Sequence, residues 1–264
     1  MFFTDQLNRT IELQKFPKRI ISLVPSQTEL LYQLGLDDNV IGVTKFCIHP
    51  SHWKKKKKIV GGTKNYKIEL IDDLKPDLII ANKEENNKDS IENLMQKHNV
   101  WISDIKTLDH ATQMIDVIGK MTYTSQISKK LIQKINVQFQ ILKTLQKKKK
   151  SVVYLIWNKP LMTINNDTFI NHLMSLNNWE NCYGNHNSRY PELTKEELVE
   201  MNPDILFLSS EPFPFKIKHI EQFKQLLPTT KILIVDGEYF SWYGSRLVDS
   251  PAYFSSIHRQ LISN

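Results

Sequence analysis

The chain has 264 residues, of which 41% are apolar and 10% aromatic, so it can bury a large core and is not disordered as a whole. No stretch approaches the roughly 20 consecutive apolar residues that a membrane-spanning helix needs, which excludes a helical membrane protein. The net charge of +7 leaves nucleic-acid binding open at this point.

The first half of the chain alternates short apolar runs with helical patterns. Arg19–Val24 predicts a strand that ends at Pro25. In the helix that follows, we expect Ser26 to cap the N-terminus, Glu29 to reach back in a capping box, and Gly35 to stop the helix. Three further strands and one polar helix are predicted at Val40–Val43, Leu78–Ala81, Val100–Ser103 and Lys88–Lys97. Because these strands lack polar alternation, we expect them to be buried on both faces of a parallel sheet.

The second half, which starts at Ser151, repeats this alternation. Its predicted strands are Val152–Trp157, Ile205–Ser209 and Ile232–Val235. Its predicted helices lie near Thr168–Leu176, Lys218–Leu226 and Pro251–Ile262. Each half holds three or four strands, so the fold class is α/β, with two α/β lobes and mainly parallel sheets.

One long helix is predicted between the two halves, over Ser125–Gln146. Its apolar residues recur at three- and four-residue spacing without Pro or Gly, at Ile127, Leu131, Ile135, Phe139, Leu142 and Leu145. At 1.5 Å per residue it would be about 33 Å long. It is either an ordinary surface helix of the first lobe or, as its position favours, an interlobe brace. We therefore predict an N-terminal lobe over 1–123, an interlobe helix over 124–150 and a C-terminal lobe over 151–264.

Much of the positive charge lies in two lysine runs, Lys54–Lys58 and Lys147–Lys150. Neither run has interleaved aromatic residues, and no nucleic-acid-binding motif is present. We interpret both runs as solvated loops and expect no nucleic-acid partner. The two cysteines, Cys47 and Cys182, lack CxxC spacing, and we expect two buried free thiols, with one interlobe disulfide as the alternative.

An internal repeat occurs once in each half. Glu69–Ile79 (ELIDDLKPDLI) matches Glu196–Leu206 (EELVEMNPDIL), and in both segments a glutamate starts a short helix that Pro-Asp connects to an apolar strand. The Pro-Asp part could be a common helix–strand junction. A carboxylate is favoured at a helix N-terminus, but two at equivalent positions suggest a pseudo-symmetric partner that touches both lobes.

Together these features resemble the substrate-binding proteins of ABC importers for vitamin B12, haem and iron-siderophores, and most closely the corrinoid-binding branch. The resemblance runs from Asp5–Ile11 to the last helix and is strongest at Arg19–Leu31, Val60–Asn65 and the two repeat segments. It implies two α/β lobes joined by one long helix, with limited closure and with the ligand in the interlobe cleft.

The resemblance also implies a partner. In the vitamin B12 binders, one glutamate on each lobe docks on arginines of the membrane permease, and the matching positions here are Glu69 and Glu196. We therefore expect this chain to deliver its ligand to an ABC permease, and to be a monomer. The ligand would be a corrinoid, haem or a siderophore, whose cobalt or iron belongs to the ligand, so we expect no cofactor of the protein's own.

Candidate ligand-binding residues follow the predicted strands, because ligands of open α/β sheets bind at the carboxyl ends of strands. Trp242 and Arg246 offer a flat stacking surface and a bidentate anion donor. Where the best-known vitamin B12 binder has aromatic pocket residues, this chain has His49, Thr63, Asn82 and Leu161, while Tyr190 keeps an aromatic ring. The predicted ligand-binding set is His49, Thr63, Trp157, Tyr190, Phe213, Trp242 and Arg246.

A resident metal site and an active site are not indicated. His49 and His52 lack the three or four ligands that a metal site needs, although His49 could give an axial ligand to a metal that the bound molecule carries. No nucleophile elbow, phosphate loop, HExxH or dinucleotide fingerprint is present, so we expect no catalytic residues and no enzyme. The alternatives are a cytoplasmic carrier or sensor of the same fold, or an enzyme of tetrapyrrole metabolism.

The N-terminus, Met1–Gln6, has no basic region followed by an apolar stretch, so no secretory signal is visible. The family resemblance predicts a location in the periplasm or cell envelope. A complete chain without a signal would instead be cytoplasmic, and both locations stay open at this point.

Overall fold

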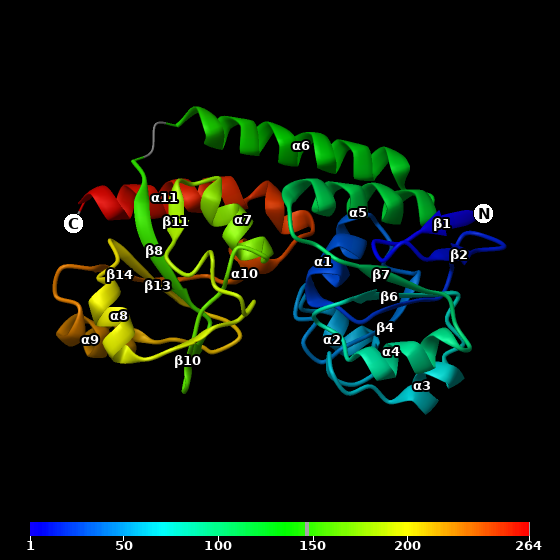
Figure 1. The fold of residues 1–264 in the computed structure, drawn as a ribbon. Coiled ribbons are helices and arrows are strands. Elements are labelled where there is room, and N and C mark those ends of the chain that lie inside the picture. Colours follow the sequence, from blue (N-terminus) through cyan, green and yellow to red (C-terminus); the bar gives the residue numbers. More distant parts are fainter. Residues whose placement is uncertain (146–147, 264) are drawn as a thin grey trace. The chain divides into compact units, whose positions relative to one another are not determined.

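The structure, a computed structural model, describes residues 1–145 and 148–263, and the chain forms two compact units (Figure 1). The first unit comprises Met1–Ile105, Asp109–Ile135 and Trp242–Arg246, and the second comprises Lys106–Leu108, Asn136–Ser241 and Leu247–Asn264. The predicted boundaries placed Trp242–Arg246 in the C-terminal lobe, whereas the structure packs this segment with the first unit.

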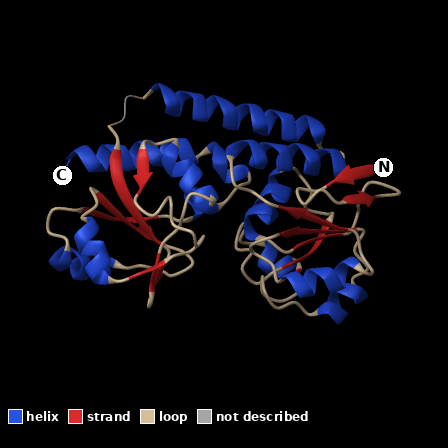
Figure 2. Cartoon of the chain, in the orientation of Figure 1, coloured by secondary structure: helices blue, strands red, loops and turns tan. Residues whose placement is uncertain are grey.

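A five-stranded parallel sheet forms the centre of the first unit, in the order β5-β4-β3-β6-β7. Its strands are β3 (Ile20–Ser22), β4 (Val40–Val43), β5 (Lys58–Ile59), β6 (Leu78–Asn82) and β7 (Val100–Ser103) (Figure 2). All residues of β3, β6 and β7 are buried. The prediction of parallel strands buried on both faces is therefore confirmed.

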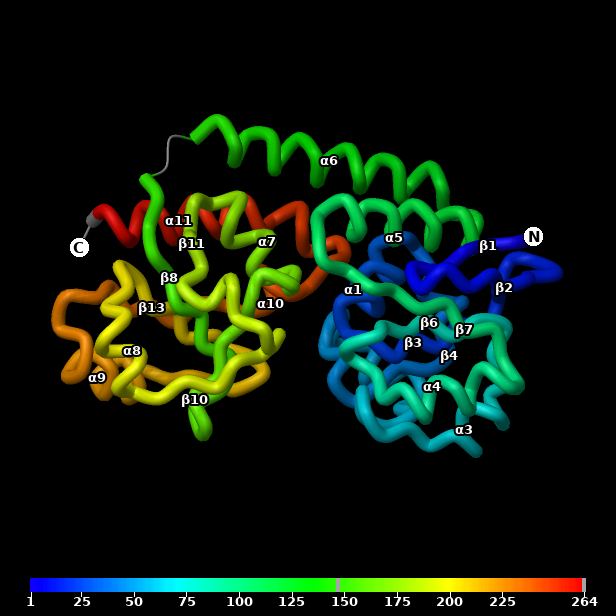
Figure 3. Tube along the Cα trace, in the orientation of Figure 1, coloured from blue at the N-terminus to red at the C-terminus, as the bar shows by residue number. Residues whose placement is uncertain are grey.

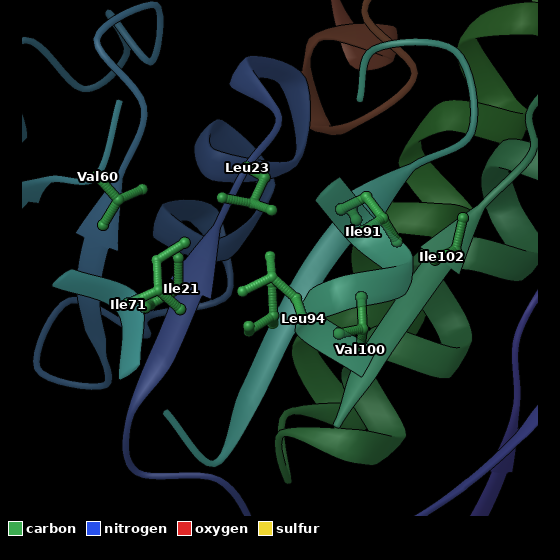
Figure 4. Close-up of a cluster of buried hydrophobic side chains, with 10 residues drawn as sticks. Ile21, Leu23, Val60, Ile71, Ile91, Leu94, Val100 and Ile102 are labelled. Atoms are coloured by element: carbon green, nitrogen blue, oxygen red, sulfur yellow. The ribbon is translucent and has the colours of Figure 1, made fainter. Parts of the chain in front are cut away.

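Helices cover both faces of this sheet: α1 (Pro25–Gln33), α2 (Trp53–Lys56), α3 (Ile68–Asp73), α4 (Lys88–Met95) and α5 (Leu108–Met121). Figure 3 shows α5 on the opposite side of the sheet from α3 and α4. Ile71 of α3 and Leu94 of α4 pack on Ile21 and Ile79 of the strands in one buried cluster (Figure 4). Apolar burial of this kind contributes about 25 cal/mol per Å² and is the main term that holds the layers together.

The predicted capping box of α1 is wrong. The helix begins at Pro25 with Val24 as N-cap, and no side chain caps it. Proline is well accommodated at the first helical position because its missing N–H has no intrahelical partner there. Ser26 therefore already lies inside the helix, and Glu29 is used elsewhere. The predicted stop is confirmed, because Gly35 follows the helix with φ +79°.

The predicted long helix is α6 (Ser125–Thr144), and the division between the units falls within it, after Ile135. Gln146, where the prediction ended it, and Lys147 lie outside the described residues, as does Asn264. Ile135, Phe139 and Leu142 are buried as expected, but Ile127 and Leu145 are 45% and 44% exposed. The apolar face is therefore narrower than the spacing predicted.

The second unit is built on a four-stranded parallel sheet in the order β11-β8-β13-β14. Its strands are β8 (Lys150–Leu155), β11 (Trp179–Asn181), β13 (Ile205–Ser209) and β14 (Lys231–Val235). Its helices are α7 (Phe169–Ser175), α8 (Lys195–Met201), α9 (Ile217–Leu226), α10 (Glu238–Ser241), the 3-10 turn η1 (Ser245–Val248) and α11 (Ser250–Ser263). The sequence did not predict β11, which is short and half polar.

Two small antiparallel elements complete the fold, and the sequence predicted neither. The N-terminal strands β1 (Phe2–Thr4) and β2 (Thr10–Glu12) pair with each other. In the second unit, β9 (Trp157–Asn158), β10 (Leu161–Met162) and β12 (Glu192–Leu193) form a three-stranded sheet. The predicted strand Val152–Trp157 therefore ends at Leu155, and Trp157 belongs to this second sheet.

The internal repeat has the same backbone geometry in both units. Lys75 and Asn202, the residues before each Pro-Asp, have φ angles of +43° and +39°, which end α3 and α8. Asp77 accepts hydrogen bonds from the main chain of Lys18 and Arg19 at 2.8 and 3.0 Å. Asp204 accepts from the main-chain N–H of Ser151 at 2.9 Å, next to the equivalent strand. Each aspartate thus ties its helix–strand junction to the neighbouring strand.

Candidate functional site

Each unit brings a set of loops to the carboxyl edge of its parallel sheet. In each parallel sheet, the strand that comes first in the sequence, β3 or β8, has a neighbouring strand on both sides. The loops that follow these strands therefore lie at the same edge of the sheet. Open α/β sheets bind ligands at such positions.

In the first unit, three predicted residues lie together. The Trp242 ring contacts the His49 ring edge-on, with ring centres 5.5 Å apart, and the Arg246 guanidinium carbon lies 4.8 Å from the Trp242 ring centre. Trp242 is only 7% exposed. The Arg246 guanidinium and the half-buried His49 ring thus both pack against the Trp242 indole.

Arg246 is the predicted anion donor, and it donates to a carboxylate of its own unit. Its Nη2 and Nε donate to the two oxygens of Glu29 at 2.8 and 3.2 Å. This is the bidentate geometry that arginine favours with carboxylates. The backbone comes close enough for this contact at Gly244, where an added Cβ would lie 2.7 Å from the Ser26 carbonyl oxygen.

Thr63 lies in a turn at a pocket of the same unit. Its carbonyl oxygen accepts hydrogen bonds from Asn86 Nδ2 at 3.0 Å and from the Tyr66 hydroxyl, which fix the turn. Burial raises the pKa of Tyr66, so this phenol stays a proton donor at neutral pH. The pocket has a volume of about 660 Å³ and follows β4 and β5.

Asn82, which the resemblance placed in the ligand pocket, is 2% exposed and serves the loop after β6 instead. Its Oδ1 accepts the main-chain N–H groups of Glu84 and Glu85 at 2.8 and 3.0 Å, and its Nδ2 donates to the Ser103 carbonyl oxygen at 3.1 Å. Buried amides that use both polar ends in this way stabilise a loop conformation.

In the second unit, Trp157 and Phe213 lie together. Their rings meet at 67° with centres 5.6 Å apart, and Phe213 also contacts Phe215 and His219. Trp157 is 39% exposed, and its Nε1 donates to the Lys159 carbonyl oxygen at 3.1 Å. The indole is therefore held in place by a polar contact while much of its face stays accessible.

Tyr190 is the remaining predicted residue and lies beside Arg189, whose guanidinium carbon is 5.9 Å from the tyrosine ring centre. The ring is 39% exposed. Arg189 also faces Asp167 at 3.5 Å, and Lys106 faces the same carboxylate at 2.6 Å. Leu161, another pocket position from the resemblance, is only 6% exposed in β10.

Glu69 and Glu196, the two predicted docking residues, have the same local geometry. Each is the second residue of its helix, α3 or α8, and each is exposed. Among the described residues, neither carboxylate takes part in a hydrogen bond or an ion pair. Both are therefore free to contact a partner.

The cysteines are both free thiols. Cys47 is buried, and its sulfur lies 3.0 Å from Thr28 Oγ1 and 3.2 Å from Thr44 Oγ1. Burial raises the pKa of this thiol. Cys182 is half-buried rather than buried as expected. Within residues 1–145 and 148–263, no three His, Cys, Asp or Glu side chains cluster as a metal site would require, and no helix is long and apolar enough to cross a membrane.

The sequence profile of the family described as "Periplasmic binding protein" matches residues 20–229. The chain belongs to this family. Members of the periplasmic binding protein family are solute-binding proteins rather than enzymes, so the expectation of a binding function is confirmed, and the tetrapyrrole-enzyme alternative is not supported.

Three known proteins are similar to this periplasmic binding protein. An uncharacterized ABC transporter substrate-binding lipoprotein of Bacillus subtilis is 29% identical over 213 residues, which are 76% of this chain and 67% of the lipoprotein. A vitamin B12-binding protein of Vibrio campbellii is 28% identical over 195 residues, 73% and 70% of the two chains. The crystal structure of the periplasmic vitamin B12-binding protein of Vibrio cholerae superimposes with a TM-score of 0.82 at 22% identity, over 94% of this chain and 99% of the other, which confirms the fold.

Sequence reasoning did not select Lys64 and Lys67 of the 660 Å³ pocket or the partner of Arg246. Lys45 and Phe46 lie in the loop after β4, which position after a strand indicates, and Lys64 follows Gly62 and Thr63 in the loop after β5. The pairing of Glu29 with Arg246 joins residues 217 positions apart. No local pattern predicts a contact of that length.

Proposed function

We propose that this protein is the substrate-binding component of an ABC importer and that it carries a corrinoid or a related metal-containing macrocycle or chelate. The observation that carries the ligand class is the aromatic pair after the parallel sheet of the second unit, where Trp157 is 39% exposed and contacts Phe213. Flat conjugated ligands stack on such rings. The relatives that bind vitamin B12 support the same ligand class.

The proposed ligand contacts are the residues selected from the sequence: His49, Thr63, Trp242 and Arg246 in the first unit, and Trp157, Tyr190 and Phe213 in the second. The cobalt or iron would arrive with the ligand. The protein would contribute stacking surfaces and polar contacts at the periphery of the macrocycle, which is how mostly apolar ligand sites achieve orientation.

Titration of the purified protein with cyanocobalamin, dicyanocobinamide, haem and a ferric siderophore tests this function. We expect saturable absorbance changes with at least one of them, together with quenching of tryptophan fluorescence. The Trp157→Phe/Trp242→Phe variant should lose most of the quenching, because Trp53, Trp101 and Trp179 are at most 1% exposed. Unchanged quenching and affinity in this variant would show that the ligand binds elsewhere.

We further propose that Glu69 and Glu196 dock this protein on an ABC permease. A carboxylate that meets an arginine across a partly desolvated contact contributes about 2–5 kcal/mol. An exposed carboxylate without a partner contributes under about 1 kcal/mol to folding. Glu69→Ala/Glu196→Ala should therefore abolish transport and leave ligand affinity and melting temperature unchanged.

The matched control for docking is Glu92→Ala/Glu200→Ala, which removes one exposed glutamate from each unit outside the first helical turns. This control should transport normally. Loss of ligand binding in Glu69→Ala/Glu196→Ala would assign these residues to the ligand site. Persistent transport in that variant would favour the carrier or sensor alternative.

We place the protein at the cell envelope, because its relatives are a lipoprotein and periplasmic proteins. Import requires the binding protein to meet its permease on the outer side of the membrane. Fractionation of the native cells with an antibody to this chain tests the location. Recovery in the cytosol alone would contradict it.

A further inference from the structure

We infer that the pocket of the first unit binds an anionic oxygen group of the ligand, a carboxylate or a phosphate. This inference rests on the proposed function and narrows its substrate class to macrocycles or chelates that carry such a group. The pocket, defined here by Lys45, Phe46, the turn Gly61–Asn65 and Lys67, has a volume of about 660 Å³.

The position of the pocket is that of a ligand site. Lys45 and Phe46 lie in the loop after β4, and the turn Gly61–Asn65 lies in the loop after β5, so the pocket lies at the carboxyl ends of two neighbouring parallel strands. The predicted ligand residue Thr63 belongs to its wall. The pocket therefore extends the site that the sequence indicated.

The turn is fixed by its own backbone. Gly61 has a φ of +129°, and a Cβ there would lie 2.4 Å from the Asn65 carbonyl oxygen, so only glycine fits. Gly62 donates to that same oxygen at 2.8 Å, and Lys45 donates from its main chain to the Gly61 carbonyl oxygen at 2.8 Å. These bonds hold Lys45 next to the turn that carries Lys64.

The charge of the pocket is of one sign. Three lysines, Lys45, Lys64 and Lys67, line it, and no Asp or Glu does. In the part of the chain that the structure describes, none of these three ammonium groups forms a salt bridge. By contrast, Lys57 and Lys83 of the same unit pair with carboxylates at 2.9 and 2.7 Å.

The side chains around these charges restrict what can bind. The Lys45 ammonium lies 5.0 Å from the centre of the Phe46 ring, which is 50% exposed, and the Lys64 ammonium donates to the Glu84 carbonyl oxygen. An exposed aromatic ring beside an uncompensated ammonium group suits a flat ligand with an anionic substituent. A neutral or cationic ligand would bring no negative charge to a pocket wall that carries three lysines.

The test compares ligand pairs that differ in the anionic group. Haem carries two carboxylates, and its dimethyl ester carries none. Cyanocobalamin carries a phosphodiester, and dicyanocobinamide lacks it. The pocket variant is Lys45→Gln/Lys64→Gln/Lys67→Gln, and the matched control is Lys54→Gln/Lys55→Gln/Lys56→Gln, which removes the same charge from the exposed helix α2.

In at least one ligand pair, we expect the protein to bind the member that carries the anionic group at least about tenfold more tightly than the member that lacks it. The pocket variant should weaken that binding about tenfold, reduce its salt dependence and change the Kd of the neutral member less than threefold. The control variant should leave all Kd values within about twofold.

Two results would overturn the inference and are distinguishable. Tight binding with equal Kd values within both pairs, or with no response to the pocket variant, would refute the anionic subsite and leave the proposed function standing. If the protein bound none of the four compounds nor a ferric siderophore, the proposed function would fall, and the inference with it. A circular dichroism spectrum and melting temperature equal to the parent's would show that the pocket variant is folded.

Discussion

Replacing Glu29 by glutamine should destabilise the first unit far more than the loss of an ordinary surface charge. Glu29 and Arg246 face each other at 2.8 and 3.2 Å, and their side chains are only 18% and 13% exposed. Two unit charges about 4 Å apart interact with about 4 kcal/mol at an effective dielectric constant of 20. Part of this energy offsets the desolvation of both groups.

The magnitude follows from what the variant leaves behind. Glu29→Gln keeps the shape but removes the carboxylate charge that the mostly buried Arg246 guanidinium faces. Breaking a fully buried pair costs about 3–5 kcal/mol, and the remaining exposure here reduces that value to about 2–3 kcal/mol. Glu92→Gln is the control, because its pair with Lys88 is 3.7 Å long and exposed, and it should cost under 0.5 kcal/mol.

Urea denaturation followed by tryptophan fluorescence measures both effects, and Trp242 reports directly because Arg246 packs on its ring. In a double-mutant cycle with Arg246→Met, the coupling energy should exceed about 1.5 kcal/mol. A Glu29→Gln variant no less stable than Glu92→Gln would refute the idea that this pair holds the segment Trp242–Arg246 in place.

Two further predictions concern acid stability and helix packing. The Lys150 ammonium and then the Ser151 N–H hold the pKa of Asp204 below its usual 3.8, so the folded state releases this proton more readily than the unfolded state. The stabilisation is complete above about pH 3.8 and is lost as the pH falls through the lower folded pKa. In Asp204→Asn, the free energy of unfolding should therefore decrease less at acid pH than it does in the parent protein. Gly119→Ala should lower stability by about 1–3 kcal/mol despite the better helix propensity of alanine, because its Cβ would lie 2.5 Å from Ser128 Cβ. Thermal denaturation measures this loss, which should disappear when Gly119→Ala is combined with Ser128→Gly. A Gly119→Ala protein more stable than the parent would contradict the close contact between Gly119 and Ser128.

The sequence predicted those parts of the fold that depend on local apolar patterns. Leu78–Ala81 and Val100–Ser103 are continuous apolar runs, and both are buried strands in the structure. The N-terminal strand Thr10–Glu12 and strand Trp179–Asn181 were missed, because each is three residues long and carries polar side chains. Strand Trp179–Asn181 pairs with β8, about 30 residues away in the sequence, and no local pattern contains that contact.

The candidate site was predictable to the extent that position after a strand determines it. His49, Trp157 and Phe213 were selected in this way, and in the structure they follow β4, β8 and β13 in the chain. The grouping of Lys45 with Lys67 was not predictable, because a turn with a positive φ at Gly61 brings them to one pocket.

The segment Trp242–Arg246 packs with the first unit although it is synthesised after most of the second. This determines the order in which the two units can complete their folding during synthesis. At about 5–20 residues per second, a ribosome needs roughly 5–20 s to extend the nascent chain from Ile135 to Arg246. Throughout that interval the emerging first unit lacks the guanidinium for Glu29 and the indole beside His49. The candidate site of the first unit is therefore completed only after the sheet of the second unit has left the ribosome, and a chain released before Arg246 would not contain it.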